Sequence, residues 1–176
     1  MFQTIDPKKL DKNLFSLLGD RWALVTAGTA EQCNTMTVSW GGTGILWNQP
    51  VVTIYLRPQR YTKEFVDREE YFTLAFFGPE HHDHLALCGS KSGRDVDKVT
   101  ECGFTVKTAP CGAPYFEEAE LVFVCRKRFV QPMTSHRNIK RGSTPRRTTT
   151  SCISARSWRF WKSVEPPMWR NLNLDI

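Results

Sequence analysis

The sequence has 176 residues, of which 40% are hydrophobic and 12% aromatic, values typical of one globular domain that buries its own core. It contains no apolar run near the ~18 to 20 residues that a transmembrane helix needs. Its first residues also lack the uninterrupted apolar block of a secretory signal. These features exclude a membrane-spanning helix, and we expect a cytoplasmic protein with no membrane partner.

The positive charge of the chain is confined to its C-terminal part. The net charge is +6, but residues 1–133 carry 15 Lys and Arg against 16 Asp and Glu, whereas residues 134–176 carry 9 against 2. The first part is therefore close to neutral, and we expect no nucleic-acid partner for it. The six cysteines are scattered without a CxxC pair, so we expect reduced thiols and neither disulfides nor a zinc site.

Short runs of β-branched and aromatic residues, separated by glycine and proline, predict a protein built mainly of strands. In chain order, we expect strands over residues 21–28, 34–40, 51–56, 71–77, 104–107 and 121–130, and short helices over 62–70, 81–87 and 95–101. Several short strands with few helices favour a closed or partly closed β-barrel over a doubly wound parallel sheet.

Three connecting segments carry specific expectations. Gly41-Gly42-Thr43-Gly44 indicates a turn and not a phosphate-binding loop, because the strand-to-helix context of such a loop is missing. Thr62 is expected to cap the helix that follows it, since its hydroxyl can accept a hydrogen bond from a free helix N–H. The polar loop over residues 89–94 has the sequence GSKSGR. It is a candidate site because its glycines permit unusual backbone angles.

The segment from Arg57 to Thr62 has the composition of a phosphate site. The guanidinium groups of Arg57 and Arg60 match the geometry of phosphate oxygens, and the start of a helix favours an anion. Exposed arginines at the end of a strand are a common alternative, and these residues alone leave both interpretations open.

Several motifs occur in the order of a known family. They are NTMTVSWGGTGILWNQP, RPQRYTKEF, YFTLAFF, CGSKSGRDVDKV and YFEEAELVFVCRK, all within residues 1–133. This succession resembles the flavin reductase-like, FMN-binding split-barrel family, and specifically its flavoredoxin-type branch. The resemblance implies a mainly β split barrel with short helices over residues 1–133. It also implies a homodimer with FMN at the interface.

The resemblance further implies which residues hold the cofactor. The segment from Asn34 to Ser39 would line the isoalloxazine, the segment from Arg57 to Thr62 would hold the phosphate and ribityl groups, and residues 90–93 would close over FMN. The cofactor-binding residues expected are Asn34, Thr35, Met36, Thr37, Val38, Ser39, Arg57, Arg60, Tyr61, Thr62, Ser90, Lys91, Ser92 and Gly93. None transfers protons, which suits a reaction in which the flavin accepts a hydride, so we expect no catalytic side chain.

Two activities fit this set of residues. The first is an NAD(P)H-dependent flavin reductase, and the alternative is a flavoredoxin-type electron carrier that exchanges electrons with a redox protein and does not use NAD(P)H directly. Lys91, Arg94 and Lys98 could hold the phosphates of a nicotinamide nucleotide, but a solvated polar loop explains them equally well.

Two other groups of residues are interpreted as structural. In the sequence HHDH only His81 and His84 can share a helix face, so an ordinary surface helix is favoured over a metal site. Cys88, beside the candidate loop, is interpreted as a small buried side chain in preference to a redox thiol.

The segment over residues 134–176 has neither a strand nor a helix period, and we predict no barrel strand from it. A shift of the reading frame joins the last base of each codon to the first two bases of the next. In this shifted frame, the codons of residues 142–163 permit the sequence FYPEKDYHKLHIGEIVEVLEK. Its apolar and polar residues alternate as those of the family's closing strand would. We therefore interpret residues 134–176 as a frameshifted tail that is poorly ordered or non-native, with the last strand missing or replaced. The arginines and tryptophans of this tail suit single-stranded nucleic acid, but the frameshift accounts for them without that function.

Overall fold

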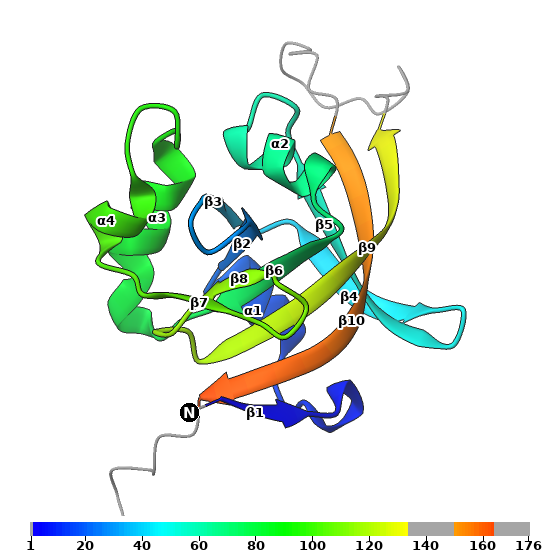
Figure 1. Ribbon diagram of the computed structural model, residues 1–176. Coiled ribbons are helices and arrows are strands. Elements are labelled where there is room, and N and C mark those ends of the chain that lie inside the picture. The colour runs from blue at the N-terminus through cyan, green and yellow to red at the C-terminus, as the bar shows by residue number, and fades with distance from the viewer. Residues whose placement is uncertain (1, 134–149, 164–176) are drawn as a thin grey trace, which may run out of the picture.

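The computed structural model describes the backbone of residues 2–133 and 150–163 and the side chains of residues 3–132. In chain order the elements are β1 (Phe2–Ile5), η1 (Pro7–Lys9), α1 (Leu14–Gly19), β2 (Ala23–Gly28), β3 (Cys33–Val38), β4 (Gly41–Leu46), β5 (Gln49–Leu56), α2 (Tyr61–Arg68), β6 (Tyr71–Phe76), η2 (Pro79–His81), α3 (His82–Ser90), α4 (Lys98–Cys102), β7 (Val106–Thr108), β8 (Pro114–Phe116), β9 (Leu121–Met133) and β10 (Thr150–Ser163). The predicted mainly β composition with short helices is confirmed (Figure 1). None of the helices in the described part of the chain has the length and apolar character to cross a membrane.

One strongly curved antiparallel sheet forms the body of the molecule. Its strand order is β3-β2-β6-β9-β10-β5-β4, and β1 pairs with β10 beside this path. The sheet curls until β5 approaches the end of β3, where the backbone N–H of Tyr55 donates to the carbonyl oxygen of Trp40 at 3.4 Å. The expected partly closed barrel is confirmed, and α2 lies at one end of it while α3 and α4 lie along its side (Figure 1).

Strand β10 completes the sheet, so the prediction of no barrel strand within residues 134–176 is wrong for residues 150–163. Ile153 of β10 lies opposite Ile54 of β5 and Val130 of β9. A backbone ladder needs only N–H and C=O groups, so a segment without period-two alternation can still form it. The tail residues 134–149 and 164–176 lie outside the described residues, and their expected non-native character stays a prediction.

The predicted turn at the glycine-rich segment is wrong. Residues 41–44 lie in β4, which pairs with β5 along its whole length. The hairpin turns instead at Trp47 and Asn48, whose φ angles of 49° and 57° have the signs of a type I′ turn. Asparagine tolerates this left-handed region, whereas tryptophan occupies it at a cost, so the glycines were the stronger but misleading turn signal.

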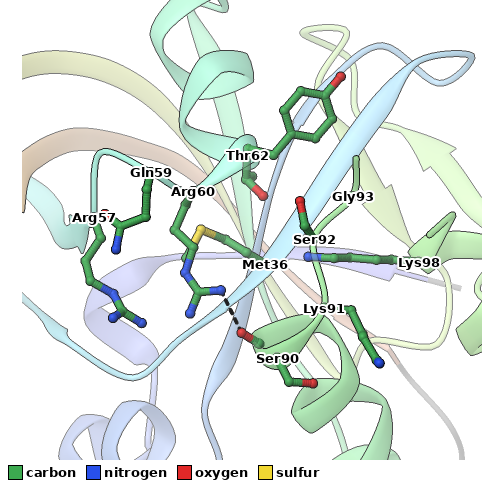
Figure 2. Close-up of a pocket in the computed structure, with 12 residues that line it drawn as sticks. Met36, Arg57, Gln59, Arg60, Thr62, Ser90, Lys91, Ser92, Gly93 and Lys98 are labelled. Atoms are coloured by element: carbon green, nitrogen blue, oxygen red, sulfur yellow. Dashed lines mark hydrogen bonds between the residues drawn. The ribbon is translucent and has the colours of Figure 1, made fainter. Parts of the chain in front are cut away.

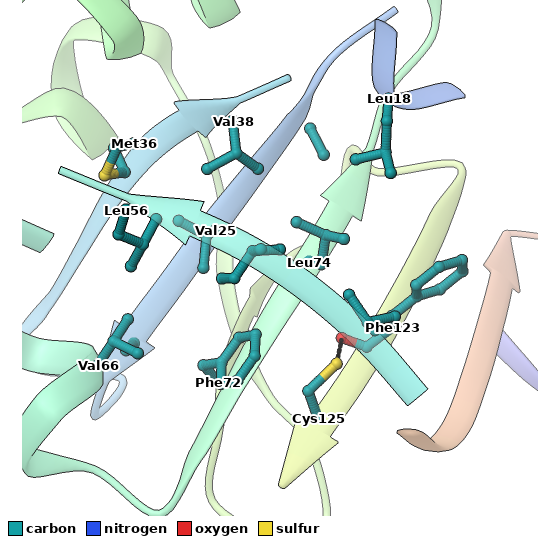
Figure 3. Close-up of a cluster of buried hydrophobic side chains, with 14 of the residues drawn as sticks. Leu18, Val25, Met36, Val38, Leu56, Val66, Phe72, Leu74, Phe123 and Cys125 are labelled. Atoms are coloured by element: carbon teal, nitrogen blue, oxygen red, sulfur yellow. Dashed lines mark hydrogen bonds between the residues drawn. The ribbon is translucent and has the colours of Figure 1, made fainter. Parts of the chain in front are cut away.

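The predicted alternation along the strand that begins at Leu121 is confirmed, and both faces of the first part of β9, residues 121–125, are buried. Phe123 and Cys125 belong to the core inside the barrel, which also contains Phe72 from β6 (Figure 3). Val122 and Val124 face a second core that packs the sheet against α3, α4 and the β7–β8 hairpin. This second core fixes α3 and α4 beside β3, and the gap between them and α2 is where the candidate site forms.

Candidate functional site

The candidate site begins at the connection between the end of β5 and the start of α2. Arg57, Gln59 and Arg60 follow the strand directly, and α2 starts at Tyr61. Arg60 occupies the N-cap position of this eight-residue helix, and no side chain caps its first N–H groups. The N-terminus of α2 therefore presents unpaired donors and the positive end of the helix dipole to whatever lies beside it.

The expected capping role of Thr62 is wrong, because Thr62 lies inside the first turn of α2. Its hydroxyl oxygen accepts a hydrogen bond from Nδ2 of Asn34 at 2.8 Å. Thr62 is 1% exposed, so this bond ties the start of α2 to β3 in a site closed to water. A contact over such a separation in the chain outweighs the local capping tendency of threonine.

A cavity of about 410 Å³ lies between the start of α2 and the end of α3 (Figure 2). Its lining residues are Met36, Arg57, Gln59, Arg60, Tyr61, Thr62, Gly89, Ser90, Lys91, Ser92, Gly93 and Lys98. Four of these described lining residues are basic and none is acidic. The cavity therefore has the size of a small-molecule site and a field that attracts an anion.

The two arginines of the cavity differ in their surroundings. Nη1 of Arg60 donates to the carbonyl oxygen of Gly89 at 2.7 Å, which fixes its guanidinium across the cavity (Figure 2). Partial burial, and next the positive charge of Arg57, lower the pKa of Arg60. A bound anion would relieve this repulsion, which is the electrostatic character expected of a phosphate site.

The residues of β3 divide between the cavity and two neighbouring hollows. Met36 lines the main cavity, and Thr37, Val38 and Ser39 line an adjoining hollow of about 110 Å³. Trp40, Tyr55, Arg57 and Arg60 form the rest of that hollow's wall.

Two expected residues, Asn34 and Thr35, line a groove on the other side of the 91–97 loop. The hydroxyl of Thr35 donates to the carbonyl oxygen of Val25 at 3.1 Å and is 2.9 Å from the hydroxyl of Thr26, so it is engaged inside the protein. The amide of Asn34 is likewise bonded to Thr62.

The structure thus brings most of the predicted set to the main cavity and its adjoining hollow, but not Asn34 and Thr35. Ser90, Lys91, Ser92 and Gly93 line the main cavity with the predicted residues of α2 and its preceding turn.

Three lining residues, Gln59, Gly89 and Lys98, were not in the predicted cofactor-binding set. The sequence signal that could have identified them is their position within the motifs RPQR and CGSKSGRDVDK, which also contain predicted cofactor-binding residues.

Lys98 is the least expected member of the site. It is 4% exposed, and its Nζ donates to the carbonyl oxygens of Thr35 and Cys88, each at 2.8 Å. Cys88 lies in the last turn of α3, where carbonyl groups lack helical partners, so Lys98 caps that helix while joining it to β3. Desolvation is the main cause that lowers the pKa of Lys98.

The other groups considered from the sequence have structural surroundings. His81 and His84 share a helix face as expected, with their Nδ1 atoms 3.1 Å apart, and both rings pack on Phe104. Within the described residues no group of three metal-ligating side chains occurs. Cys88 is fully buried, its Sγ lies 3.8 Å from that of Cys102, and burial raises its pKa to about 12.

The chain is similar to several proteins of known structure and matches one family model. No curated protein matches the sequence. Among solved structures, it is similar to flavoredoxin from Methanosarcina acetivorans, with 20% identity, a TM-score of 0.66 and coverage of 90% of this chain and 76% of that one. It is also similar to an FMN-binding protein from Thermus thermophilus, with 18% identity, a TM-score of 0.66 and coverage of 92% and 82%.

A further similar structure is the FMN-binding domain of a flavin reductases-like enzyme from Shewanella baltica, with 18% identity, a TM-score of 0.67 and coverage of 92% and 77%. At these identities the structures establish a shared fold. The sequence itself matches the model of the flavin reductase like domain over residues 15–139. The chain therefore belongs to the flavin reductase like domain family.

Proposed function

We propose that this chain binds FMN in the cavity between α2 and α3 and acts as an NAD(P)H-dependent flavin reductase. The observation that carries the proposal is the cavity wall: two arginines and two lysines without an acidic residue, beside uncapped N–H groups of α2. This donor set fits a phosphate monoester. The FMN-binding proteins from Thermus and Shewanella among the similar structures support the same ligand.

Each part of the cofactor has suitable surroundings. Arg57, Arg60 and the start of α2 would hold the phosphate. The adjoining hollow beside Met36, with Trp40 and Tyr55 in its wall, offers the apolar and aromatic surface that a planar ring system needs. Bound FMN would supply hydride and electron chemistry, while these residues bind it, orient it and exclude water.

The flavoredoxin-type alternative uses the same cavity. In that case bound FMN exchanges electrons with a redox protein, and NAD(P)H does not reduce it directly. The flavoredoxin of Methanosarcina acetivorans among the similar structures favours this second function.

A second copy of the chain is the partner that fits the exposed apolar side chains. Trp47 is 72% exposed, Ile45 65% and Trp40 57%. The first two lie on the β4–β5 hairpin, which projects from the barrel (Figure 1). Exposed apolar groups of this kind mark association surfaces, so we propose a homodimer that uses this hairpin.

Two measurements test the function. FMN added to the purified protein should show quenched fluorescence and a shifted flavin band near ~450 nm, and Arg57→Ala with Arg60→Ala should weaken binding of FMN far more than binding of riboflavin. Arg68→Ala, which removes an arginine outside the cavity wall, is the matched control. Equal losses for FMN and riboflavin would place the phosphate elsewhere.

Rapid mixing with NADH or NADPH separates the two activities. A flavin reductase loses the oxidised flavin band within the turnover time, whereas a carrier keeps it until dithionite is added. Bleaching by neither nicotinamide would leave the electron-carrier function as the one supported.

A further inference from the structure

The loop over residues 91–97 separates the proposed FMN cavity from the neighbouring groove. The carbonyl oxygen of Ser92 accepts hydrogen bonds from the N–H groups of Asp95 and Val96, each at 3.1 Å. The hydroxyl of Ser92 accepts another from the N–H of Arg94 at 3.2 Å. These internal bonds give the loop its own compact shape.

Both ends of this loop are anchored. Before it, the carbonyl oxygen of Gly89 accepts from Arg60 at 2.7 Å. At its C-terminal end, Asp97 caps α4 by accepting from the N–H groups of Val99 and Thr100 at 3.0 and 3.3 Å. The buried Lys98 follows directly. The middle of the loop is therefore the part whose position must be set by other contacts.

Arg94 provides such a contact between the loop and α2. Its guanidinium carbon lies 4.4 Å from the ring centroid of Tyr61, and its Nη2 forms an ion pair with Oε1 of Glu64. Tyr61 and Glu64 both belong to the first turn of the helix whose N-terminus faces the cavity. The side chains of Arg94 and Glu64 are 48% and 60% exposed, so these contacts can open without disturbing the core.

Gly93 supplies a second contact, with β3. A Cβ atom at Gly93 would lie 2.0 Å from Oδ1 of Asn34, so the backbone of the loop rests directly on that amide. The same amide donates to Thr62 of α2. The loop therefore lies directly against the Asn34–Thr62 pair, and a side chain at position 93 would have to displace the Asn34 amide.

We propose that Arg94 is a positioning residue that clamps the 91–97 loop onto α2 and thereby retains FMN as a resident group. This inference rests on the proposed function, and it favours slow FMN exchange over the use of FMN as a diffusing substrate. The clamp also means that the Arg94 guanidinium is engaged by α2 when the loop is closed, so it is not a free phosphate ligand for a nicotinamide nucleotide.

The clamp should change cofactor release measurably. An exposed cation–π contact and an exposed ion pair each contribute modestly, and together they correspond to about a tenfold change in an equilibrium or rate constant. Because the clamp acts on the closed state, the change should appear in the dissociation rate of FMN.

The test compares Arg94→Gln with Arg68→Gln, a control at the far end of α2 whose arginine makes the same kinds of contact. The guanidinium of Arg68 lies 4.8 Å from the ring centroid of Phe65, and its Nε lies 3.0 Å from Glu69. FMN release is followed by the recovery of its fluorescence on dilution. We expect about tenfold faster release from Arg94→Gln and an unchanged rate from Arg68→Gln. Equal rates for wild type and Arg94→Gln overturn the clamp and leave the FMN site standing.

A second measurement needs no FMN. Glu64→Gln keeps Lys91 and Arg94 as tryptic sites but weakens the ion pair, so FMN-free Glu64→Gln protein should be cut after Lys91 several times faster than wild type. Unchanged cleavage together with unchanged release refutes the clamp. If wild type takes up no FMN, the proposed function fails, and faster cleavage then supports the loop tether alone while the retention role is rejected.

Discussion

Replacing Lys98 with methionine should destabilise the protein, because the buried ammonium holds two elements together. Methionine keeps most of the apolar stem but cannot donate to the carbonyl oxygens of Thr35 and Cys88. The Cys88 carbonyl lies in the last turn of α3 and loses its cap. The substitution therefore separates α3 from β3 at the floor of the cavity without creating a large void.

The magnitude follows from the two bonds and the cost of burying a charge. Hydrogen bonds to charged groups contribute about 1.5–3 kcal/mol each, and relief from burying the ammonium offsets part of that loss. We expect a net loss of about 3 kcal/mol in the free energy of unfolding, or a fall of roughly 6–12 °C in Tm for a chain of this size.

The difference between wild type and Lys98→Met should also depend on pH. Burial lowers the pKa of Lys98 below its ordinary 10.5 in the folded protein. Between the lowered pKa and 10.5 the unfolded chain binds more protons at this site than the folded one does, so wild type gains stability relative to Lys98→Met as pH rises. Below the lowered pKa the difference is constant.

Urea denaturation followed by tryptophan fluorescence, repeated from neutral to alkaline pH, measures both effects. Lys91→Met is the control, since Lys91 is exposed at the cavity rim and its loss should change stability by no more than about 0.5 kcal/mol. A loss below about 0.5 kcal/mol in Lys98→Met, or a difference that shrinks as pH rises, would refute this account of the buried lysine.

Four further changes have expected outcomes. Gly93→Ala should weaken FMN binding at least ~tenfold in a fluorescence titration, because the new Cβ displaces the Asn34 amide. Phe123→Ala, at a fully buried position, should cost about 3–5 kcal/mol in urea denaturation. Of the cysteines whose side chains are described, only the exposed Cys111 should react rapidly with a thiol reagent near pH 8, and Cys111→Ser should abolish that fast phase. A chain in which FYPEKDYHKLHIGEIVEVLEK replaces residues 142–163 should melt at a higher temperature than this one, and an equal or lower Tm would count against the frameshift.

Patterns within a short stretch of sequence predicted most of the barrel. The alternation from Leu121 onward indicated β9, and β-branched runs indicated β2, β3, β5 and β6, because half-buried strands repeat every two residues. Strand β8 has only three residues, Pro114–Phe116, and is too short to show a period. The glycines of β4 were misleading because pairing with β5, and not side-chain type, makes that segment a strand.

The site was predictable as a set of residues but not as a set of contacts. Basic and hydroxyl residues near Arg57 and Ser90 stood out by composition. A lysine within a polar loop looks exposed, and nothing local shows that Lys98 reaches a carbonyl 63 residues earlier in the chain. Thr62 likewise bonds to Asn34, 28 residues away, where local propensity predicted a helix cap. Side chains whose partners come from distant strands are fixed only when the barrel has closed.

The central place of β10 governs when this chain can fold during synthesis. Ile153 emerges about 100 residues after Ile54, which it faces across the ladder. At about 5–20 residues per second, β5 waits roughly 5–20 s without this neighbour while the ribosome completes the chain. Its unpaired edge is open to other strands throughout that interval, so the barrel cannot close before β10 has been made.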